Sequence, residues 1–136
     1  MKVFDCFCFA GETNLLELRL NLYENHVDYF IIVEANIDFR GNKKEILIDD
    51  KVLKKYPKIR HIKLEESDFK TVDPWQREII SRNAILRRLS DAEDDDLIIL
   101  SDIDEIISPS KLPNIANSIR VYELYWHRFF LNYINL

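Results

Sequence analysis

Three carboxylates that directly follow a short apolar run are the residues of this sequence best suited to chemistry. The run 97–100 leads through Ser101 into Asp102, Asp104 and Glu105. Such a run is typical of a strand that is buried on both faces of a sheet. If the chain stays extended beyond the strand, Asp102 and Asp104 point to the same side. Two carboxylates placed in this way could bind Mg²⁺ or Mn²⁺, which leave coordination positions open for substrate phosphates.

The same pattern also has a structural interpretation, because Ser and Asp commonly begin turns at strand ends. Two features favour a site over a turn alone. The run that delivers the pair is wholly apolar, and a third acid follows the pair at once. The motif by itself therefore indicates that metal or phosphate chemistry is possible. Which of these applies has to be inferred from the rest of the chain.

Length and composition predict one globular domain over residues 1–136. The chain is 47% hydrophobic and has only two glycines and four prolines, which leaves little material for linkers. A net charge of −5 argues against a nucleic-acid partner, which usually needs a basic surface. No 18-residue apolar stretch predicts a membrane span. Cys6 and Cys8 lie two apart on one expected strand, where we expect reduced thiols in a cytoplasmic protein.

Strand-like and helix-like segments alternate along the chain. We expect strands at 3–9, 27–33, 59–64 and 97–100, and helices at 14–23, 49–56 and 73–89. We also expect a short edge strand at 45–48 and strand-like aromatic segments at 120–126 and 128–133. This alternation predicts an α/β fold with a mostly parallel sheet and helices on both faces. Ligands usually bind at the carboxyl ends of such strands, where Asp102 and Glu34 would lie.

Apolar periodicity predicts which helix faces pack on the sheet. In the first helix these residues are Leu15, Leu18 and Leu22, with Leu16 and Leu20 beside them, and in the third they are Trp75, Ile79, Leu86 and Leu89. Arg82 falls on the same face as the second set and needs a partner, because an unpaired buried charge is costly. That partner could be Glu78, a carboxylate on the sheet or a ligand phosphate.

Several separate blocks, in their order and spacing, resemble glycosyltransferase family 17, the family of β-1,4-mannosyl-glycoprotein 4-β-N-acetylglucosaminyltransferases. The matching blocks are residues 7–9, 12–20, 27–36, 38–43, 75–78 with Arg82, 95–106 and 129–133. The chain departs from the family pattern at Asn14, Ala35, Asp38 and Ile107, where Asp, Ser, Thr and Pro are common. None of these departures removes a carboxylate of the acidic motif.

The resemblance implies a GT-A-like (Rossmann-like) fold, a UDP-sugar donor, an Mn²⁺ or Mg²⁺ cofactor and transfer with inversion. The transferred sugar would be N-acetylglucosamine, and the acceptor a glycan or glycolipid. The site would then lie in the cytoplasm, or beside a membrane where surface glycans are assembled.

On this interpretation each candidate residue has a role. Asp104 would bind the metal directly, and Asp102 would contact the ribose or reach the metal through water. The remaining donor-binding candidates are Phe9, Ala10, Glu34, Asn36, Arg77 and Arg82. Inversion also needs a base, and Glu105 is the only acid adjacent to the pair. Its side chain should point away from the pair. The sequence stops at Leu136 within an expected element, so we expect a further C-terminal part that carries the base, and we expect the 136-residue chain to bind the donor without transferring the sugar.

Two alternatives come from other classes of protein. A metal-dependent phosphatase or phosphotransferase would use Asp102 as nucleophile and Asp104 as acid, but such enzymes usually carry the pair on an early strand with Thr or Val where Ile106 stands. A non-catalytic α/β interaction module would need the acids only for structure. Metal-dependent binding of UDP separates these alternatives from the transferase.

Overall fold

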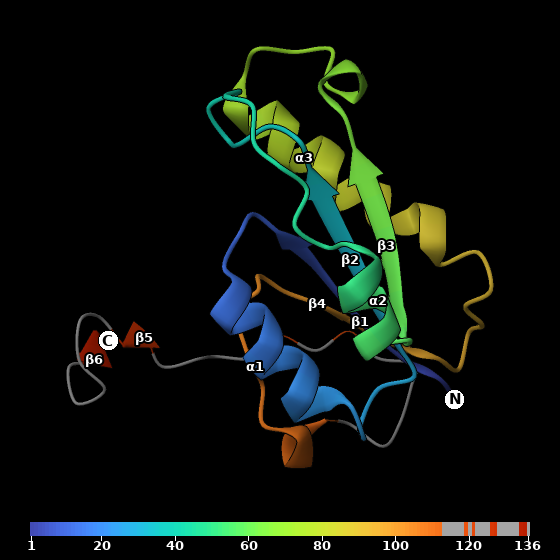
Figure 1. Ribbon diagram of the computed structural model, residues 1–136. Helices are drawn as coiled ribbons and strands as arrows, with labels where there is room; N and C mark the ends of the chain where they lie inside the picture. The colour runs from blue at the N-terminus through green and yellow to red at the C-terminus, as the bar shows by residue number, and fades with distance from the viewer. Residues whose placement is uncertain (113–118, 120, 122–125, 128–133, 136) are drawn as a thin grey trace.

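A four-stranded parallel sheet forms the centre of the protein (Figure 1). The computed structural model describes residues 1–112, 119, 121, 126–127 and 134–135. The strands are β1 (Val3–Phe9), β2 (Tyr29–Ala35), β3 (Ile59–Leu64) and β4 (Leu97–Leu100), in the order β3-β2-β1-β4. The sheet confirms the predicted α/β fold and places β1 at an interior position.

Helices connect the strands and begin where capping residues allow. They are α1 (Thr13–Tyr23), α2 (Asp50–Lys55) and α3 (Pro74–Ala84), with 3₁₀ turns η1 (Glu66–Asp68), η2 (Ile85–Arg88) and η3 (Pro109–Lys111). Asp49 accepts hydrogen bonds from the backbone N–H groups of Lys51 and Val52, and Asp73 accepts one from Trp75. A short antiparallel pair, β5 (Trp126–His127) with β6 (Ile134–Asn135), completes the described elements.

The alternation of side chains along the sheet produces two cores. One face packs on α1 and α2 and buries Phe7, Phe9, Leu16, Leu20, Tyr23, Val27, Phe30, Ile32, Ile48, Tyr56 and Ile103. The other packs on α3 and η2 and buries Phe4, Cys6, Ile31, Val33, Ile62, Leu64, Ala84 and Ile85. Figure 1 shows α1 and α2 on one side of the sheet and α3 on the other, as the crossover rule requires.

The predicted core face of α1 is confirmed only in part, because Leu15 packs on the core beside the buried Leu16 and Leu20 but the other two leucines do not. Leu18 and Leu22 are 54% and 41% exposed, whereas the helix buries Leu16, Leu20, Tyr23 and Arg19. The physical reason is a charge on the sheet: Asp5 faces this helix from inside β1 and pairs with Arg19. The helix is therefore rotated so that an arginine, and not a leucine, lies against the strand.

The predicted packing of α3 and β4 also needs correction. Trp75, Ile79 and Leu86 are 68%, 50% and 69% exposed, because the helix contacts the sheet through its end, at Ala84, and through Ile85 in η2. In β4, Ile98 and Leu100 are 46% and 59% exposed. β4 pairs only with β1 among the described strands, so it is not the strand buried on both faces that its apolar run predicts.

Residues 45–48 form no strand. The N–H groups of Leu47 and Ile48 donate to the Glu34 carboxylate instead, at 2.7 and 3.2 Å. The predicted strand 120–126 lies almost wholly outside the described residues, and the segment 128–133 lies wholly outside them. Within the described part of the chain, no helix is both long enough and apolar enough to cross a membrane.

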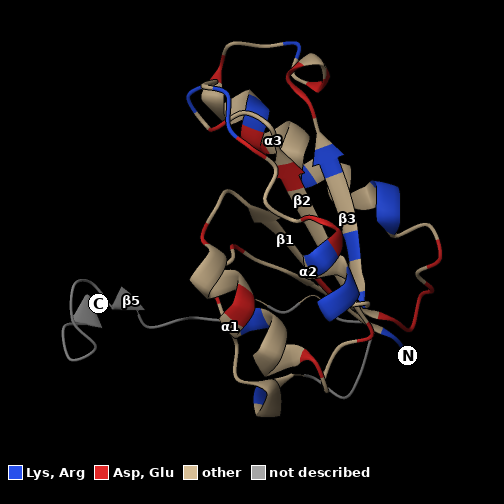
Figure 2. Ribbon diagram, in the orientation of Figure 1, with Lys and Arg blue, Asp and Glu red and all other residues tan. Residues whose placement is uncertain are grey.

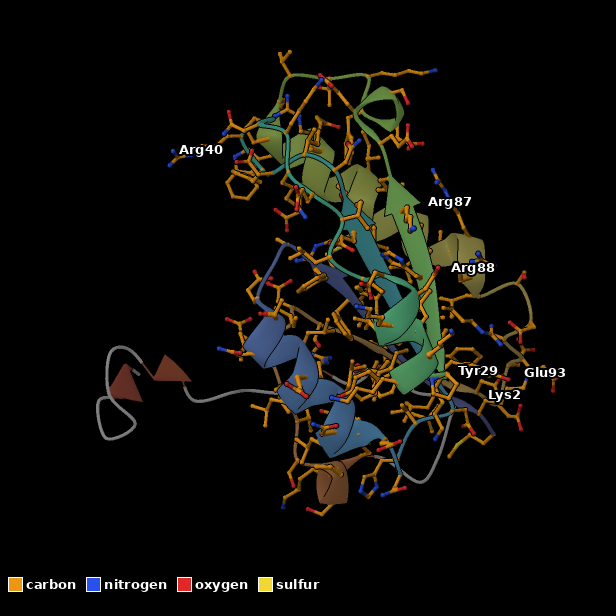
Figure 3. All side chains as sticks on the ribbon, viewed as in Figure 1. Lys2, Tyr29, Arg40, Arg87, Arg88 and Glu93 are labelled. Carbon is orange, nitrogen blue, oxygen red and sulfur yellow. The ribbon has the colours of Figure 1, made fainter. Side chains whose placement is uncertain are left out.

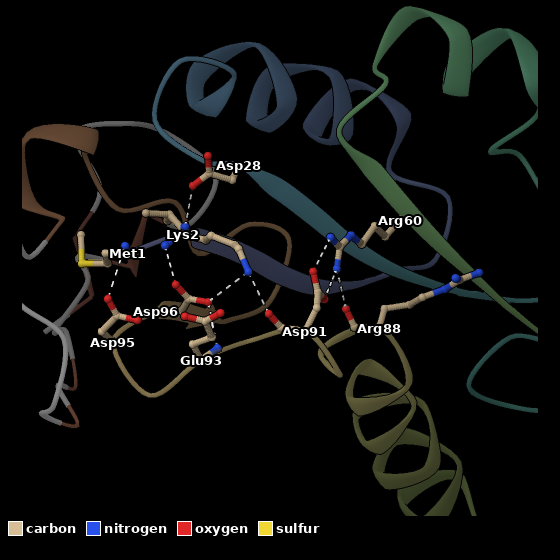
Figure 4. A network of polar contacts seen from close by, with 10 residues as sticks. Met1, Lys2, Asp28, Arg60, Arg88, Asp91, Glu93, Asp95 and Asp96 are labelled. Carbon is tan, nitrogen blue, oxygen red and sulfur yellow. Dashed lines mark hydrogen bonds and ion pairs between the residues drawn. The ribbon is translucent and has the colours of Figure 1, made fainter.

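Charged residues tie the chain together at the amino ends of the strands (Figure 4). Asp96, whose side chain is 2% exposed, accepts a hydrogen bond from the Lys2 backbone, and Asp91 binds Arg60 through both carboxylate oxygens. Part of the acidic segment 91–96 is therefore held in contacts with the chain start and with β3. Over the described part of the ribbon, acidic and basic segments are interspersed (Figure 2).

Candidate active site

The acidic residues lie in a turn that begins where β4 ends. The Glu105 N–H donates to the Asp102 carbonyl at 3.1 Å, and the Asp102 N–H donates to the Glu105 carboxylate at 2.9 Å. The chain is therefore not extended at these residues, and the strand alternation that would point Asp102 and Asp104 to the same side does not apply. The turn still brings both acids to one hollow of about 270 Å³, which Glu12 also lines.

A second cavity, of about 220 Å³, lies at the carboxyl edge of the sheet and unites most of the predicted donor-binding residues. Its lining includes Phe9, Ala10, Arg77, Arg82 and Asp102. The strands supply its floor through Cys8, Val33 and Ala35, the loop after β2 supplies Ile37, Asp38, Phe39 and Lys44, and α3 with the segment before it supplies Phe69, Glu78 and Ser81. The cavity thus combines an apolar floor with two arginines and a lysine.

Arg82 pairs with both of the carboxylates that the sequence left as alternatives. Its Nη2 lies 2.6 Å from Asp102 Oδ1, and its Nε donates to Glu78 Oε1 at 3.1 Å. Partial burial opposes the positive charge, but the charges of Asp102 and Glu78 outweigh it and raise the pKa of Arg82. Arg82 is therefore a permanent cation beside the acidic turn, and its Nη1 has no hydrogen-bond partner among the described residues.

Arg77 reaches the cavity beneath the loop that follows β2. Its Nη1 donates to the Phe39 carbonyl at 3.3 Å. Gly41 crosses over the guanidinium with a φ of +90°, and a Cβ at this position would lie 2.8 Å from both terminal nitrogens. Only glycine fits here without strain. Figure 3 shows that Arg40, in the same loop, points away from the sheet, so the arginines of this cavity are Arg77 and Arg82 and not Arg40.

Glu34 does not reach the cavity. It is fully buried, and its oxygens accept the backbone N–H groups of Leu47 and Ile48. The His61 Nε2 and the Lys44 Nζ lie 3.1 and 3.8 Å from its carboxylate. Burial works against the charge of Glu34, but these contacts outweigh it and lower the pKa of the carboxyl. The structure thus uses Glu34 to hold the loop 44–48 onto the sheet.

Asn36 and Glu105 occupy other positions than the cavity lining. The Asn36 N–H pairs with the Leu64 carbonyl, and its side-chain Oδ1 is buried with no hydrogen-bond partner among the described residues. Glu105 is tied by its own carboxylate to the Asp102 N–H, which closes the turn. Its role as a base, and the role of Asn36 at the donor, stay predictions.

The acidic pair fits a cation that takes most of its ligands from outside the protein. Among the described residues, no group of three or more His, Cys, Asp or Glu side chains is arranged to hold a metal ion. The carboxylate of Asp104 has no hydrogen-bond or ion-pair partner there, and one oxygen of Asp102 is free of Arg82. Mg²⁺ and Mn²⁺ suit one or two carboxylates completed by water and phosphate oxygens.

Sequence reasoning missed the residues that support this site. Arg19 is fully buried and bonds to the backbone of the acidic turn, and Asp5 binds Arg19 in turn. A signal was present, because Asp5 is the one charge in the apolar strand 3–9 and Arg19 lies among leucines. Lys44 and Ser81 also line the cavity, but no pattern in the sequence distinguishes them from other surface residues.

A parallel sheet with an acidic turn and arginines at its carboxyl edge is a Rossmann-like α/β arrangement, in which ligands bind at that edge. The family comparison agrees: the model of glycosyltransferase family 17 matches residues 1–133, so the chain belongs to this family and is a glycosyltransferase. No curated protein and no solved structure is significantly similar to the chain. Family membership favours a transferase over the phosphatase and interaction-module alternatives.

Proposed function

We propose that the protein is an inverting, metal-dependent glycosyltransferase that moves N-acetylglucosamine from a UDP-sugar to a glycan or glycolipid acceptor. The observation that carries this proposal is the juxtaposition of Arg82 and Asp102 at a 2.6 Å ion pair in the wall of a cavity at the carboxyl edge of the sheet. Membership in family 17 supports the class of sugar.

Different residues of the cavity would bind different parts of the donor. Arg77 and Arg82 would bind the diphosphate, because a guanidinium presents paired donors that match phosphate oxygens. Phe9 and Ala10, at the end of β1, would border the nucleoside. Asp104 would hold the cation, with Asp102 on the ribose or on a water of that cation. The cation, Mn²⁺ or Mg²⁺, would stabilise the charge that develops on the departing diphosphate.

The reaction forms a bond from the acceptor oxygen to the anomeric carbon while the bond to UDP breaks. The electron pair of the broken bond leaves on the β-phosphate oxygen, and the proton of the acceptor hydroxyl goes to a base. Arg82 contributes most if it binds the leaving group more tightly as charge builds up, because only such differential binding lowers the barrier.

Titration calorimetry tests the donor and cation parts of this proposal. We expect saturable binding of UDP in Mn²⁺ and much weaker binding without it. Asp104→Ala should weaken Mn²⁺-dependent binding by about 100-fold, since even outer partners of metal sites typically contribute 10–100-fold. Asp94→Ala is the matched control, because Asp94 is an exposed acid on the turn at the opposite edge of the sheet.

The result that contradicts the proposal is UDP binding that is insensitive to Mn²⁺ and to Asp104→Ala, or tighter binding of GDP or CMP under the same conditions. Release of UDP from UDP-N-acetylglucosamine, measured with and without a glycan acceptor, then tests the identity of the sugar.

A further inference from the structure

A buried arginine on the far side of the sheet from Arg82 holds the acidic turn. Arg19, in α1, is 0% exposed. Its Nε and Nη2 donate to the two oxygens of Asp5 at 2.8 and 2.7 Å, which fixes the plane of the guanidinium. The guanidinium carbon also lies 4.6 Å above the ring of Phe7 and 5.6 Å from the ring of Tyr23. Asp5 and these rings leave the remaining N–H groups aimed at the turn.

Every remaining donor of this guanidinium goes to the segment 101–105. Nη2 donates to Ser101 Oγ at 2.7 Å, and Nη1 donates to the carbonyls of Asp102, Ile103 and Glu105 at 2.7, 3.2 and 3.3 Å. An arginine has five N–H donors in a rigid fork, so this set uses all of them. The carbonyls of the turn are thereby collected on the α1 side.

Burial of the Arg19–Asp5 pair allows it no other set of contacts. A buried guanidinium without partners is strongly disfavoured, and so is a buried carboxylate. Burial raises the pKa of Asp5, and the two hydrogen bonds from Arg19 oppose that effect. The pair can therefore neither separate nor turn away from the segment without leaving a buried charge unsatisfied, whereas the Asp102 side chain stays 56% exposed on the other side of the turn.

We infer that Arg19 is a positioning residue: it fixes the backbone of 101–105 so that Asp102 and Asp104 present their carboxylates to the cation and the donor diphosphate. This inference rests on the proposed function for the identity of the ligand. Arg19 touches neither ligand. Tyr23, one turn further along α1, extends the same anchor, because its hydroxyl donates to the Ile107 carbonyl at 2.6 Å.

Arg19→Lys tests the inference, because lysine keeps the charge beside Asp5 but cannot bind four further acceptors in a fixed plane. We expect a folded protein whose Mn²⁺-dependent UDP binding is weaker by about 10–100-fold, the usual effect of removing an outer-shell partner. UDP binding without the metal should change by less than about twofold. This split is the readout that a purely structural role would not produce.

Arg60→Lys is the matched control. Arg60 also forms a two-point contact with an aspartate, Asp91, and also donates to a backbone carbonyl, that of Arg88, but it lies at the amino edge of the sheet (Figure 4). Arg60→Lys should lower the melting temperature and leave UDP binding unchanged with and without Mn²⁺. Equal binding losses in both variants would overturn the inference.

A readout without any ligand separates this inference from the proposed function. In Arg19→Lys we expect amide hydrogen exchange at Glu105 and Ile106 to accelerate by about tenfold or more, while the β1–β2 amides keep their wild-type protection. Unchanged exchange in the turn overturns the positioning role even if UDP binds. Wild-type protein that fails to bind Mn²⁺ and UDP overturns the proposed function and leaves this measurement decisive for Arg19.

If Arg19→Lys does not fold, Ser101→Ala and Tyr23→Phe take its place, because they remove single contacts and keep the buried pair. Each should accelerate exchange in the turn and weaken Mn²⁺-dependent binding by several-fold. Wild-type exchange and wild-type binding in both variants would refute the anchor.

Discussion

Asp102 is held by two arginines that approach from opposite faces of the sheet. Arg82 binds its carboxylate from the α3 side at 2.6 Å, and Arg19 binds its carbonyl from the α1 side at 2.7 Å. One contact can be exchanged for a ligand, because the Arg82 side chain is 39% exposed. The other is buried and permanent. Asp102 thus has a fixed backbone and a carboxylate whose ion pair can be exchanged, which suits the donor-binding role that we propose for it.

Cys8 provides a probe of the charge in the cavity. Burial raises the pKa of its thiol to about 11, with Arg82 opposing the shift and Asp102 and Glu78 adding to it. At pH 8 only about 0.1% of the thiol is ionised, so alkylation by iodoacetamide should be on the order of 100-fold slower than for an ordinary cysteine. Asp102→Asn should increase the rate, because it removes a charge that raises this pKa.

The measurement is the rate of iodoacetamide labelling between pH 7 and 10, followed by mass spectrometry of the peptide that contains Cys8. Cys6, whose pKa burial raises to about 12, should react more slowly still, and the chain in urea provides the reference for a normal thiol. Labelling of folded Cys8 as fast as in urea would contradict the raised pKa.

Individual site residues could be predicted where one segment contains the whole signal. The acidic pair follows its strand directly. Arg82 falls at a position of the apolar face, and a charge there indicates that it has a partner. Asp5 gave a local signal for Arg19, but the contact of Arg19 with the turn could not be predicted, because the acceptors there lie more than 80 residues away and are mostly backbone carbonyls, which carry no sequence signal. The same limit applies to the contacts of Glu34 with the backbone N–H groups of Leu47 and Ile48.

At the scale of the elements, α1 shows why a helix can be predicted and its buried face cannot. Five leucines surround the helix, so apolar periodicity allows several rotations, and its contact with the sheet is decided by the pair Asp5–Arg19. Capping residues are local signals, and α2 and α3 accordingly begin directly after Asp49 and Asp73, whose side chains cap them. The burial of β4 depends on neighbours that its own sequence does not contain.

Paired leucine substitutions in α1 test the observed rotation. Leu20 is 0% exposed and packs on the sheet, so Leu20→Ala should lower the free energy of unfolding by about 2–5 kcal/mol. Leu18 is 54% exposed, and Leu18→Ala should change it by no more than about 0.5 kcal/mol. Urea denaturation followed by circular dichroism measures both values. Equal losses, or a larger loss at Leu18, would restore the face that periodicity predicts.

The loop after β2 controls Arg77 through Gly41. Gly41→Ala introduces a Cβ that would lie 2.8 Å from the guanidinium and forces alanine into a φ of +90°. We expect Arg77 to be displaced and UDP binding to weaken by about tenfold, with a loss of stability of about 1 kcal/mol from the backbone strain. Calorimetry and thermal unfolding give the two values. Gly11→Ala is the control, since Gly11 has a φ of +125° but only Leu47 nearby, and it should affect stability alone.

At the scale of the whole molecule, the two edges of the sheet have different tasks. The carboxyl edge carries the two cavities of the candidate site, and the amino edge carries a polar network that joins the chain start to the segment before β4 (Figure 4). Lys2 and Asp96 are 94 residues apart in sequence, and Arg60 and Asp91 are 31 apart. These contacts hold the amino ends of the strands together and leave the carboxyl edge, with its candidate site, free of them.

Asp91 should make the stability of the whole domain sensitive to acid. Hydrogen bonds from Arg60 lower the pKa of Asp91 from 3.8 to about 2. A carboxyl whose pKa is lower in the folded state stabilises the fold above its unfolded pKa, and this contribution is lost as pH falls from about 4 towards 2. Asp91→Asn should therefore lower the melting temperature at pH 7 and bring no further loss near pH 2.

Melting temperatures of the wild type and of Asp91→Asn between pH 2 and 7 measure this effect. Asp94→Asn, in the same turn, controls for the loss of one negative charge. A difference between wild type and Asp91→Asn that stays constant down to pH 2 would show that the contact does not depend on ionisation.

The buried position of Arg19 has a consequence for the order in which the protein folds during synthesis. β1, α1 and β2 emerge first, but the acceptors in 101–105 follow Arg19 by 82 to 86 residues. At about 5–20 residues per second the ribosome needs roughly 4–16 s to deliver them. Until then the Arg19 guanidinium of the nascent chain lacks its acceptors in the acidic turn and cannot be buried with all its hydrogen bonds made. The contacts between Arg19 and the acidic turn therefore form late in synthesis, and protein interrupted before residue 101 lacks them.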